Sequence, residues 1–179
     1  MGDTAMERKH IIISGDRHVG KTTLVNKLIA HVKVPVHGFF TRAEKPDADN
    51  LMAIYMYAAD DNVREKSEDN CIGRTQGRIK MPRTEVFDDL GVRLLSDHKD
   101  GIIVMDELGY LESLSEAFRT KVMECLDGDI PVIAAVKNRD ITFLNDIRNH
   151  PNVLVREIDQ KNRDELYEEL RGIIESWNL

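Results

Sequence analysis

The chain has 179 residues and a formal net charge of −7 at pH 7, with 41% hydrophobic and 32% charged residues. This composition predicts one globular domain over residues 1–179, and the negative charge argues against a nucleic acid or an acidic membrane held by bulk electrostatics. Because Cys71 and Cys125 lie far apart, we expect neither a disulfide scaffold nor a zinc site. No apolar run is long enough to span a membrane and residues 1–10 lack a secretory signal, so we expect a cytoplasmic protein. We take it to be a monomer.

The first half of the chain predicts strands before helices. An apolar run predicts a strand over residues 10–14, and apolar residues at helical spacing predict a helix over residues 20–32. Two further strands, over residues 36–41 and 51–58, flank a polar turn and predict a hairpin. The polar segment 60–82 predicts loops with at most one short strand.

The second half alternates regularly between helices and strands. Strands are predicted over 101–105, 131–136 and 152–158, and helices over 84–98, from Ser113 to about 126, around 144–147 and over 163–177. Ser113 and Glu116 have the spacing of a capping box. Such alternation is typical of a parallel sheet with helices on both faces. We therefore predict an α/β, three-layer sandwich with a mostly parallel central sheet, helices on both faces and an antiparallel hairpin insertion.

The segment GDRHVGKT at residues 15–22 matches G-x-x-x-x-G-K-[ST] and follows the first predicted strand. This context favours a loop whose backbone N–H groups and helix N-terminus bind phosphate. Lys21 would reach the β- and γ-phosphates, and the Thr22 hydroxyl would ligate Mg²⁺. The expected phosphate-binding residues are Gly15, Asp16, Arg17, His18, Val19, Gly20, Lys21, Thr22 and Thr23.

The second half of the expected site follows the strand predicted over residues 101–105. Asp106 comes directly after that strand, at the edge where open α/β sheets bind ligands, and is the candidate that holds Mg²⁺ together with Thr22. Glu107 is the candidate that orients and deprotonates the attacking water. With Lys21, it makes up the predicted catalytic pair.

Arginines in the middle of the chain are candidates to neutralise charge on the γ-phosphate. Those considered are Arg42, Arg64, Arg74 and Arg78, of which Arg74 and Arg78 are favoured because GRTQGR resembles a mobile loop. Arg163 either approaches the nucleotide or belongs to the cap of the last helix, and the sequence leaves both roles open.

Four segments of this chain resemble the THEP1-like nucleoside triphosphatases, a family that includes the human cancer-related NTPase. They are GDRHVGKTTLVNKL, VHGFFTRAE, VMDELGYLESLSEAFRTKV and IDQKNRDEL. The resemblance implies a P-loop fold related to the RecA-like group and Mg²⁺-dependent hydrolysis of several nucleoside triphosphates to diphosphates. It also implies that residues 15–23 bind phosphate, that Thr22 and Asp106 handle Mg²⁺, and that Glu107 activates water.

Two other functions use the same motifs. A nucleotide or small-molecule kinase would replace water with an acceptor, although no second nucleotide pocket is recognisable in the sequence. A GTP-binding switch would use residues 106–109 as D-x-x-G, but Lys137, Asn138 and Asp140 have the wrong spacing for a guanine-specific element. In either case we expect nucleoside triphosphates as the ligands, with no nucleic acid and no membrane as partners.

Overall fold

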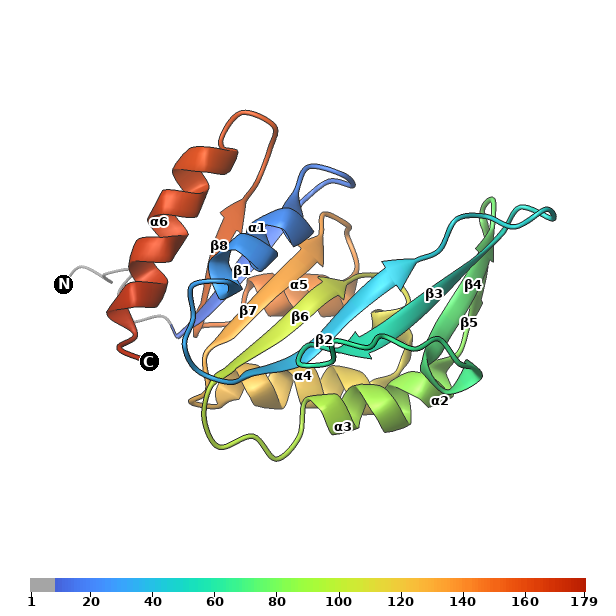
Figure 1. Cartoon of the computed structure of the whole chain (residues 1–179), viewed down its shortest axis with the longest axis horizontal. Helices are drawn as coiled ribbons and strands as arrows, with labels where there is room; N and C mark the ends of the chain where they lie inside the picture. The colour runs from blue at the N-terminus through green and yellow to red at the C-terminus, as the bar shows by residue number, and fades with distance from the viewer. Residues whose placement is uncertain (1–8) are drawn as a thin grey trace.

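The computed structural model describes residues 9–179 and forms one eight-stranded sheet with helices on both faces (Figure 1). The expected absence of a secretory signal concerns residues 1–10, and of these only residues 9 and 10 are described. The strands follow the order β5-β4-β3-β2-β6-β7-β1-β8. They are β1 (His10–Gly15), β2 (Val36–Ala43), β3 (Leu51–Ala58), β4 (Cys71–Gln76), β5 (Ile79–Pro82), β6 (Ile102–Leu108), β7 (Val132–Lys137) and β8 (Val153–Glu157).

The sheet has a parallel half and an antiparallel half. Strands β2, β6, β7, β1 and β8 run parallel, while β2, β3, β4 and β5 pair antiparallel with their neighbours. Strand β1 lies between β7 and β8, so it is buried on both sides, as its continuous apolar sequence predicts. The carboxyl ends of all five parallel strands meet at one edge of the sheet.

Two layers of helices cover the sheet (Figure 1). On one face α1 and α6 pack over β1 and β7, and on the other face lie α2 to α5. Each layer has its own apolar core, and Phe39 and Phe40, adjacent on β2, point into different ones. The helices are α1 (Lys21–Ile29), α2 (Thr84–Val86), α3 (Val92–Leu94), α4 (Glu116–Asp127), α5 (Thr142–Arg148) and α6 (Arg163–Ser176), with short turns η2 (Glu68–Asn70), η3 (Phe87–Gly91) and η4 (Glu112–Leu114).

The predicted α/β sandwich is confirmed, but the segment 60–82 differs from its prediction. It contains two strands, β4 and β5, which extend the β2–β3 hairpin to four antiparallel strands. The sequence gives no strand signal for β5, because this exposed edge strand has no buried residue. Its backbone pairs with β4 although its side chains face water.

Two helix predictions in the second half are also wrong in detail. The helix expected over 84–98 ends at Leu94 and contains the π-helical turn η3, which brings the Phe87 ring to 5.2 Å from that of Phe118. The helix expected from Ser113 begins at Glu116, and Ser115 caps it by accepting a bond from the Phe118 N–H. Ser113 lies in η4 instead. Within residues 9–179 no helix is both long and apolar enough to cross a membrane.

Candidate active site

The turn between β1 and α1 holds the residues expected to bind phosphate. Gly20 has a φ of 107°, which a residue with a Cβ adopts only under strain, and it directly precedes α1. The Arg163 Nε donates to the Val19 carbonyl at 2.7 Å, so the first residue of α6 fixes the loop from outside. The Arg163 side chain thus supports the loop backbone, which differs from both roles that the sequence left open for it.

The start of α1 leaves its first amide groups available to a ligand. No side chain caps the helix, and its first turn contains no acidic residue. Lys21 is buried, and its Nζ donates to the carbonyl oxygens of Gly15 at 2.8 Å and Asp16 at 2.6 Å. The lysine therefore lies across the turn, and its charge faces the concavity of the loop. A helix N-terminus beside an ammonium group forms an anion-binding site.

The two acids predicted after residue 105 lie at the carboxyl end of β6, beside this loop. Strand β6 is longer than expected and includes both of them. Glu107 is an extra residue in the pairing of β6 with β7, since Asp106 pairs with Ala135 and Leu108 with Val136. Such a bulge redirects side chains. Thr22 Oγ1 donates to Asp106 Oδ1 at 3.1 Å, and Lys21 Nζ lies 3.1 Å from Glu107 Oε2.

Asp106 is almost completely buried, and this raises the pKa of its carboxyl group to about 6. The hydrogen bond from Thr22 opposes the effect of burial, and the neighbouring charge of Glu107 adds to it. The other carboxylate oxygen, Oδ2, is buried and has no hydrogen-bond partner. A buried oxygen of this kind, beside a hydroxyl group, fits a hard cation such as Mg²⁺, which prefers oxygen ligands.

Two further residues contact the acid pair and were not predicted as part of the site. Thr41 Oγ1 accepts from the Glu107 N–H at 3.3 Å and donates to the Asp106 carbonyl at 3.4 Å, so it holds the bulge. Lys137 Nζ lies 3.4 Å from Glu107 Oε1. Lys137 ends strand β7, whose carboxyl end meets those of β1 and β6, and that position was the available signal.

These groups surround a cleft of about 420 Å³. It is lined by the phosphate loop, by Glu107 and Lys137 and by one face of the β2–β3 hairpin: Arg17, His18, Gly20, Lys21, Thr22, Thr23, Thr41, Ala43, Met52, Ile54, Glu107 and Lys137. Three of the apolar lining residues, Ala43, Met52 and Ile54, come from the hairpin. The cleft thus has a polar end at the loop and an apolar wall beside it.

The four candidate arginines of the middle segment do not line this cleft. Arg74 pairs with Glu68 at 2.5 Å, and Arg64 lies over the Phe40 ring at 5.8 Å. Arg42 is exposed on β2, while Arg78 lies in the turn between β4 and β5. GRTQGR is a hairpin, so the mobile loop that favoured Arg74 and Arg78 is not present.

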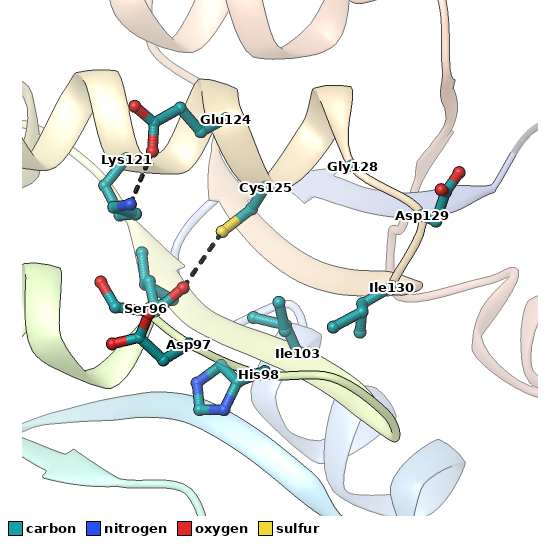
Figure 2. Close-up of a pocket in the computed structure, with 11 residues that line it drawn as sticks. Ser96, Asp97, His98, Ile103, Lys121, Glu124, Cys125, Gly128, Asp129 and Ile130 are labelled. Atoms are coloured by element: carbon teal, nitrogen blue, oxygen red, sulfur yellow. Dashed lines mark hydrogen bonds and ion pairs between the residues drawn. The ribbon is translucent and has the colours of Figure 1, made fainter.

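A second hollow, of about 320 Å³, lies at the opposite edge of the sheet (Figure 2). Apart from Ile103 of β6, its residues precede the amino ends of β6 and β7 or belong to α4. Lys121 Nζ pairs there with Glu124 at 2.6 Å, and the Cys125 thiol donates to the Leu95 carbonyl at 3.6 Å. These groups satisfy one another, and the phosphate loop and the two acids lie at the other edge.

The chain is similar to known proteins over most of its length. A family model described as NTPase matches residues 10–171. The chain is 29% identical to nucleoside-triphosphatase THEP1 of Thermotoga maritima, covering 92% of this chain and 94% of the relative. It is 31% identical to THEP1 of Methanocaldococcus jannaschii, covering 89% and 94%. The crystal structure of THEP1 from Aquifex aeolicus has the same fold, with a TM-score of 0.68 at 24% identity, covering 90% of this chain and 96% of that one.

Proposed function

The chain belongs to the NTPase family whose model it matches, and on that premise we propose that it hydrolyses nucleoside triphosphates to diphosphates and inorganic phosphate. The observation that carries the proposal is the meeting of two motifs far apart in the sequence. Thr22 and Lys21 of the phosphate loop contact Asp106 and Glu107, respectively, each at 3.1 Å. Phosphate-binding groups, a candidate metal ligand and a candidate base therefore share one cleft.

The phosphate loop would bind the triphosphate through its backbone and Lys21. No side chain caps the amide groups at the start of α1, and they would bind phosphate in the concavity that residues 15–23 enclose. Lys21 now donates to two carbonyl groups of the loop, and it would exchange part of this bonding for the more strongly charged β- and γ-phosphate oxygens. Arg163 would keep the loop in shape while this happens.

Thr22 and Asp106 are the residues that would hold Mg²⁺, directly or through water. The buried, unpartnered Oδ2 of Asp106 supports this, because an oxygen ligand of that kind is satisfied by a cation. When bound, the ion would neutralise charge on the β- and γ-phosphates. Burial raises the pKa of Asp106 to about 6, so the carboxylate form that binds a cation predominates at neutral pH.

Glu107 is the group that we propose as the base for the attacking water. Its carboxylate lines the cleft next to the phosphate loop, and Thr41 holds its backbone N–H at 3.3 Å. One side-chain oxygen faces Lys21 and the other faces Lys137, so the group is positioned between two cations. A base fixed in this way contributes about 10²–10⁴-fold to a rate.

A phosphate-release assay separates this function from its alternatives. ATP, GTP, CTP and UTP are each supplied with and without Mg²⁺ and with and without candidate acceptors. Robust release of inorganic phosphate without an acceptor, dependent on Mg²⁺, supports the hydrolase. Diphosphate formed only together with a phosphorylated acceptor would instead identify a kinase, and activity or binding restricted to GTP would identify a switch. The relatives named as nucleoside-triphosphatases favour neither alternative.

We also propose that the protein acts as a cytoplasmic monomer that requires no second chain in its cleft. Both cysteines, Cys71 and Cys125, are free thiols, as expected in a reducing compartment. The groups with a proposed role contact one another directly, so the cleft would need no residue from a second copy. Sedimentation of the active protein at the concentration of the assay tests this, because a dimer that loses activity on dilution would contradict it.

A further inference from the structure

Cations gather on one side of the cleft although the chain as a whole is acidic, with a net charge of −7. Lys21 and Lys137 face the two carboxylate oxygens of Glu107 at 3.1 and 3.4 Å. Burial lowers the pKa of Lys80, and the nearby charges of Lys137, Arg139 and Arg17 lower it further. Lys137, Arg139 and Arg17 thus each repel Lys80, and a polyanionic ligand would relieve that repulsion.

Lys137 is the cation of this group that the fold fixes most directly beside the phosphate loop. Its backbone pairs with Gly15, the first residue of the loop, and the next residue, Asn138, donates its N–H to the Gly15 carbonyl at 3.2 Å. The base of the side chain is therefore tied to the loop that would bind the phosphates. A nucleotide bound by that loop would lie within reach of the lysine.

The side chain of Lys137 passes over Gly109, and the absence of a Cβ at Gly109 makes this path possible. A Cβ there would lie 2.8 Å from Lys137 Cδ, closer than real contacts allow. The path brings Nζ to Glu107 in the cleft, while 38% of the side chain remains exposed. The ammonium group is therefore free to change partner, since no other ion pair of Lys137 is present among the described residues.

We propose that Lys137 is a catalytic residue that binds the terminal phosphate of the nucleoside triphosphate and leaves Glu107 when it does so. This inference rests on the proposed hydrolysis. A γ-phosphate carries more charge than a carboxylate, so the ammonium groups of Lys21 and Lys137 move from Glu107 to the oxygens of the γ-phosphate. Glu107 Oε1, released from Lys137, then accepts a proton. Lys137 fills the role for which the sequence suggested an arginine.

The hydrolytic step replaces the oxygen that bridges the β- and γ-phosphates with the oxygen of water. The oxygen of water forms a bond to the γ-phosphorus as the bond from that phosphorus to the β–γ bridging oxygen breaks. The bridging oxygen keeps the electron pair and leaves with the diphosphate, while one proton of the water passes to Glu107. Lys137 stays on the terminal phosphate, where it offsets charge on the equatorial oxygens throughout the transfer.

The test compares Lys137→Met with wild type, with Lys137→Arg and with Lys99→Met. Lys99 is exposed in the loop before the amino end of β6, so its substitution removes one charge at the opposite edge of the sheet. We expect kcat for Mg²⁺-dependent phosphate release to fall by about 10²-fold in Lys137→Met, as on removal of one charge-stabilising group. Lys137→Arg should recover at least about a tenth of the rate, because it keeps the charge, and Lys99→Met should match wild type.

Binding of nucleotides without turnover supplies a second readout. Lys137→Met should weaken a nonhydrolysable triphosphate by about 10-fold and leave the diphosphate unchanged, because only the triphosphate has the terminal group. Equal losses for both ligands, or a wild-type rate in Lys137→Met, would overturn the assignment while the proposed hydrolysis stands. A wild-type protein that releases no phosphate would overturn the proposed function instead. The ratio of triphosphate to diphosphate affinity would then still decide whether Lys137 contacts the terminal phosphate.

Discussion

The two edges of the parallel sheet both carry a hollow of similar size, but their polar groups differ in how completely they are paired. At the carboxyl edge, Asp106 Oδ2 is buried without a partner, and Glu107 lies between Lys21 and Lys137. At the amino edge, Lys121 pairs with Glu124 alone (Figure 2). The volumes are about 420 and 320 Å³.

The comparison teaches that these two hollows differ in their unmatched polar groups more than in their volumes, and that the carboxyl edge is the better candidate to bind a ligand. A buried oxygen without a partner costs free energy unless a ligand satisfies it. Among the described residues that line the amino-edge hollow, no side-chain atom has such a cost, and the thiol of Cys125, for example, bonds to the Leu95 carbonyl. If this is right, equal substitutions at the two edges have unequal effects.

The largest expected difference concerns the acids. Glu107→Gln should lower kcat for phosphate release by about 10²–10⁴-fold, because an amide does not accept the proton of the attacking water. Nucleotide affinity should be kept, since Glu107 does not bind the phosphates. The matched variant at the amino edge is Glu124→Gln, which removes only an exposed ion pair and should change kcat by less than about twofold. Turnover of Glu107→Gln at the wild-type rate would remove the proposed base.

A pair of lysine variants comes next. Lys21→Ala should lower turnover by about 10²–10³-fold and also weaken nucleotide binding, because this buried ammonium group is aimed at the phosphates. Lys121→Ala removes the same charge from the amino edge and should leave both quantities within about twofold of wild type. Steady-state kinetics and calorimetric titration with a nonhydrolysable triphosphate measure the two effects. Comparable losses in the two variants would mean that the edges do not differ as described.

The sequence predicts the carboxyl edge well because its signals are local. An apolar strand followed by GDRHVGKT specifies both the loop and the helix after it, and this order is observed in β1 and α1. The second acid-bearing segment is predicted for the same reason, since a continuous apolar run before Asp106 marks a buried strand. Each signal lies within about ten residues, where sequence order and spatial order agree.

What the sequence does not predict depends on pairing between distant segments. Lys137 faces Glu107 only because β7 lies between β1 and β6, an order that no local pattern contains. Strand β5 has four exposed residues and is a strand only through its bonds to β4. The choice of Ser115 over Ser113 as a helix cap likewise follows from packing, since Ser115 Oγ also donates to Asp88 on the neighbouring turn.

The edges should also respond in opposite ways to pH. At the amino edge His10 is buried, accepts from the Val132 N–H at 3.1 Å and contacts the Leu126 carbonyl at 3.0 Å. Burial lowers the pKa of His10 to about 4. Because the unfolded chain takes up the proton first, this residue costs stability as the pH falls from 6.5 toward 4. Denaturant unfolding at pH 7 and 5 should show a loss about 2 kcal/mol greater in wild type than in His10→Gln. Equal losses in wild type and His10→Gln would contradict this role of His10.

Glu112 gives the smallest effect and the opposite sign at the carboxyl edge. Its buried carboxylate accepts from the Gly109 N–H at 2.9 Å, and burial raises the pKa to about 7. The native state therefore holds the proton more tightly than the unfolded chain, and the group costs stability that grows as the pH rises from 4.5 and is complete above about 7. Glu112→Gln keeps an acceptor for Gly109 and removes the buried charge, although its new N–H₂ group needs partners. At pH 8 the variant should be more stable than wild type by about 1–2 kcal/mol in denaturant unfolding, and this gain should vanish below pH 4.5. A gain that persists at low pH would contradict this prediction and would point to improved packing. Glu112 would then no longer count as a buried, poorly matched charge at the carboxyl edge.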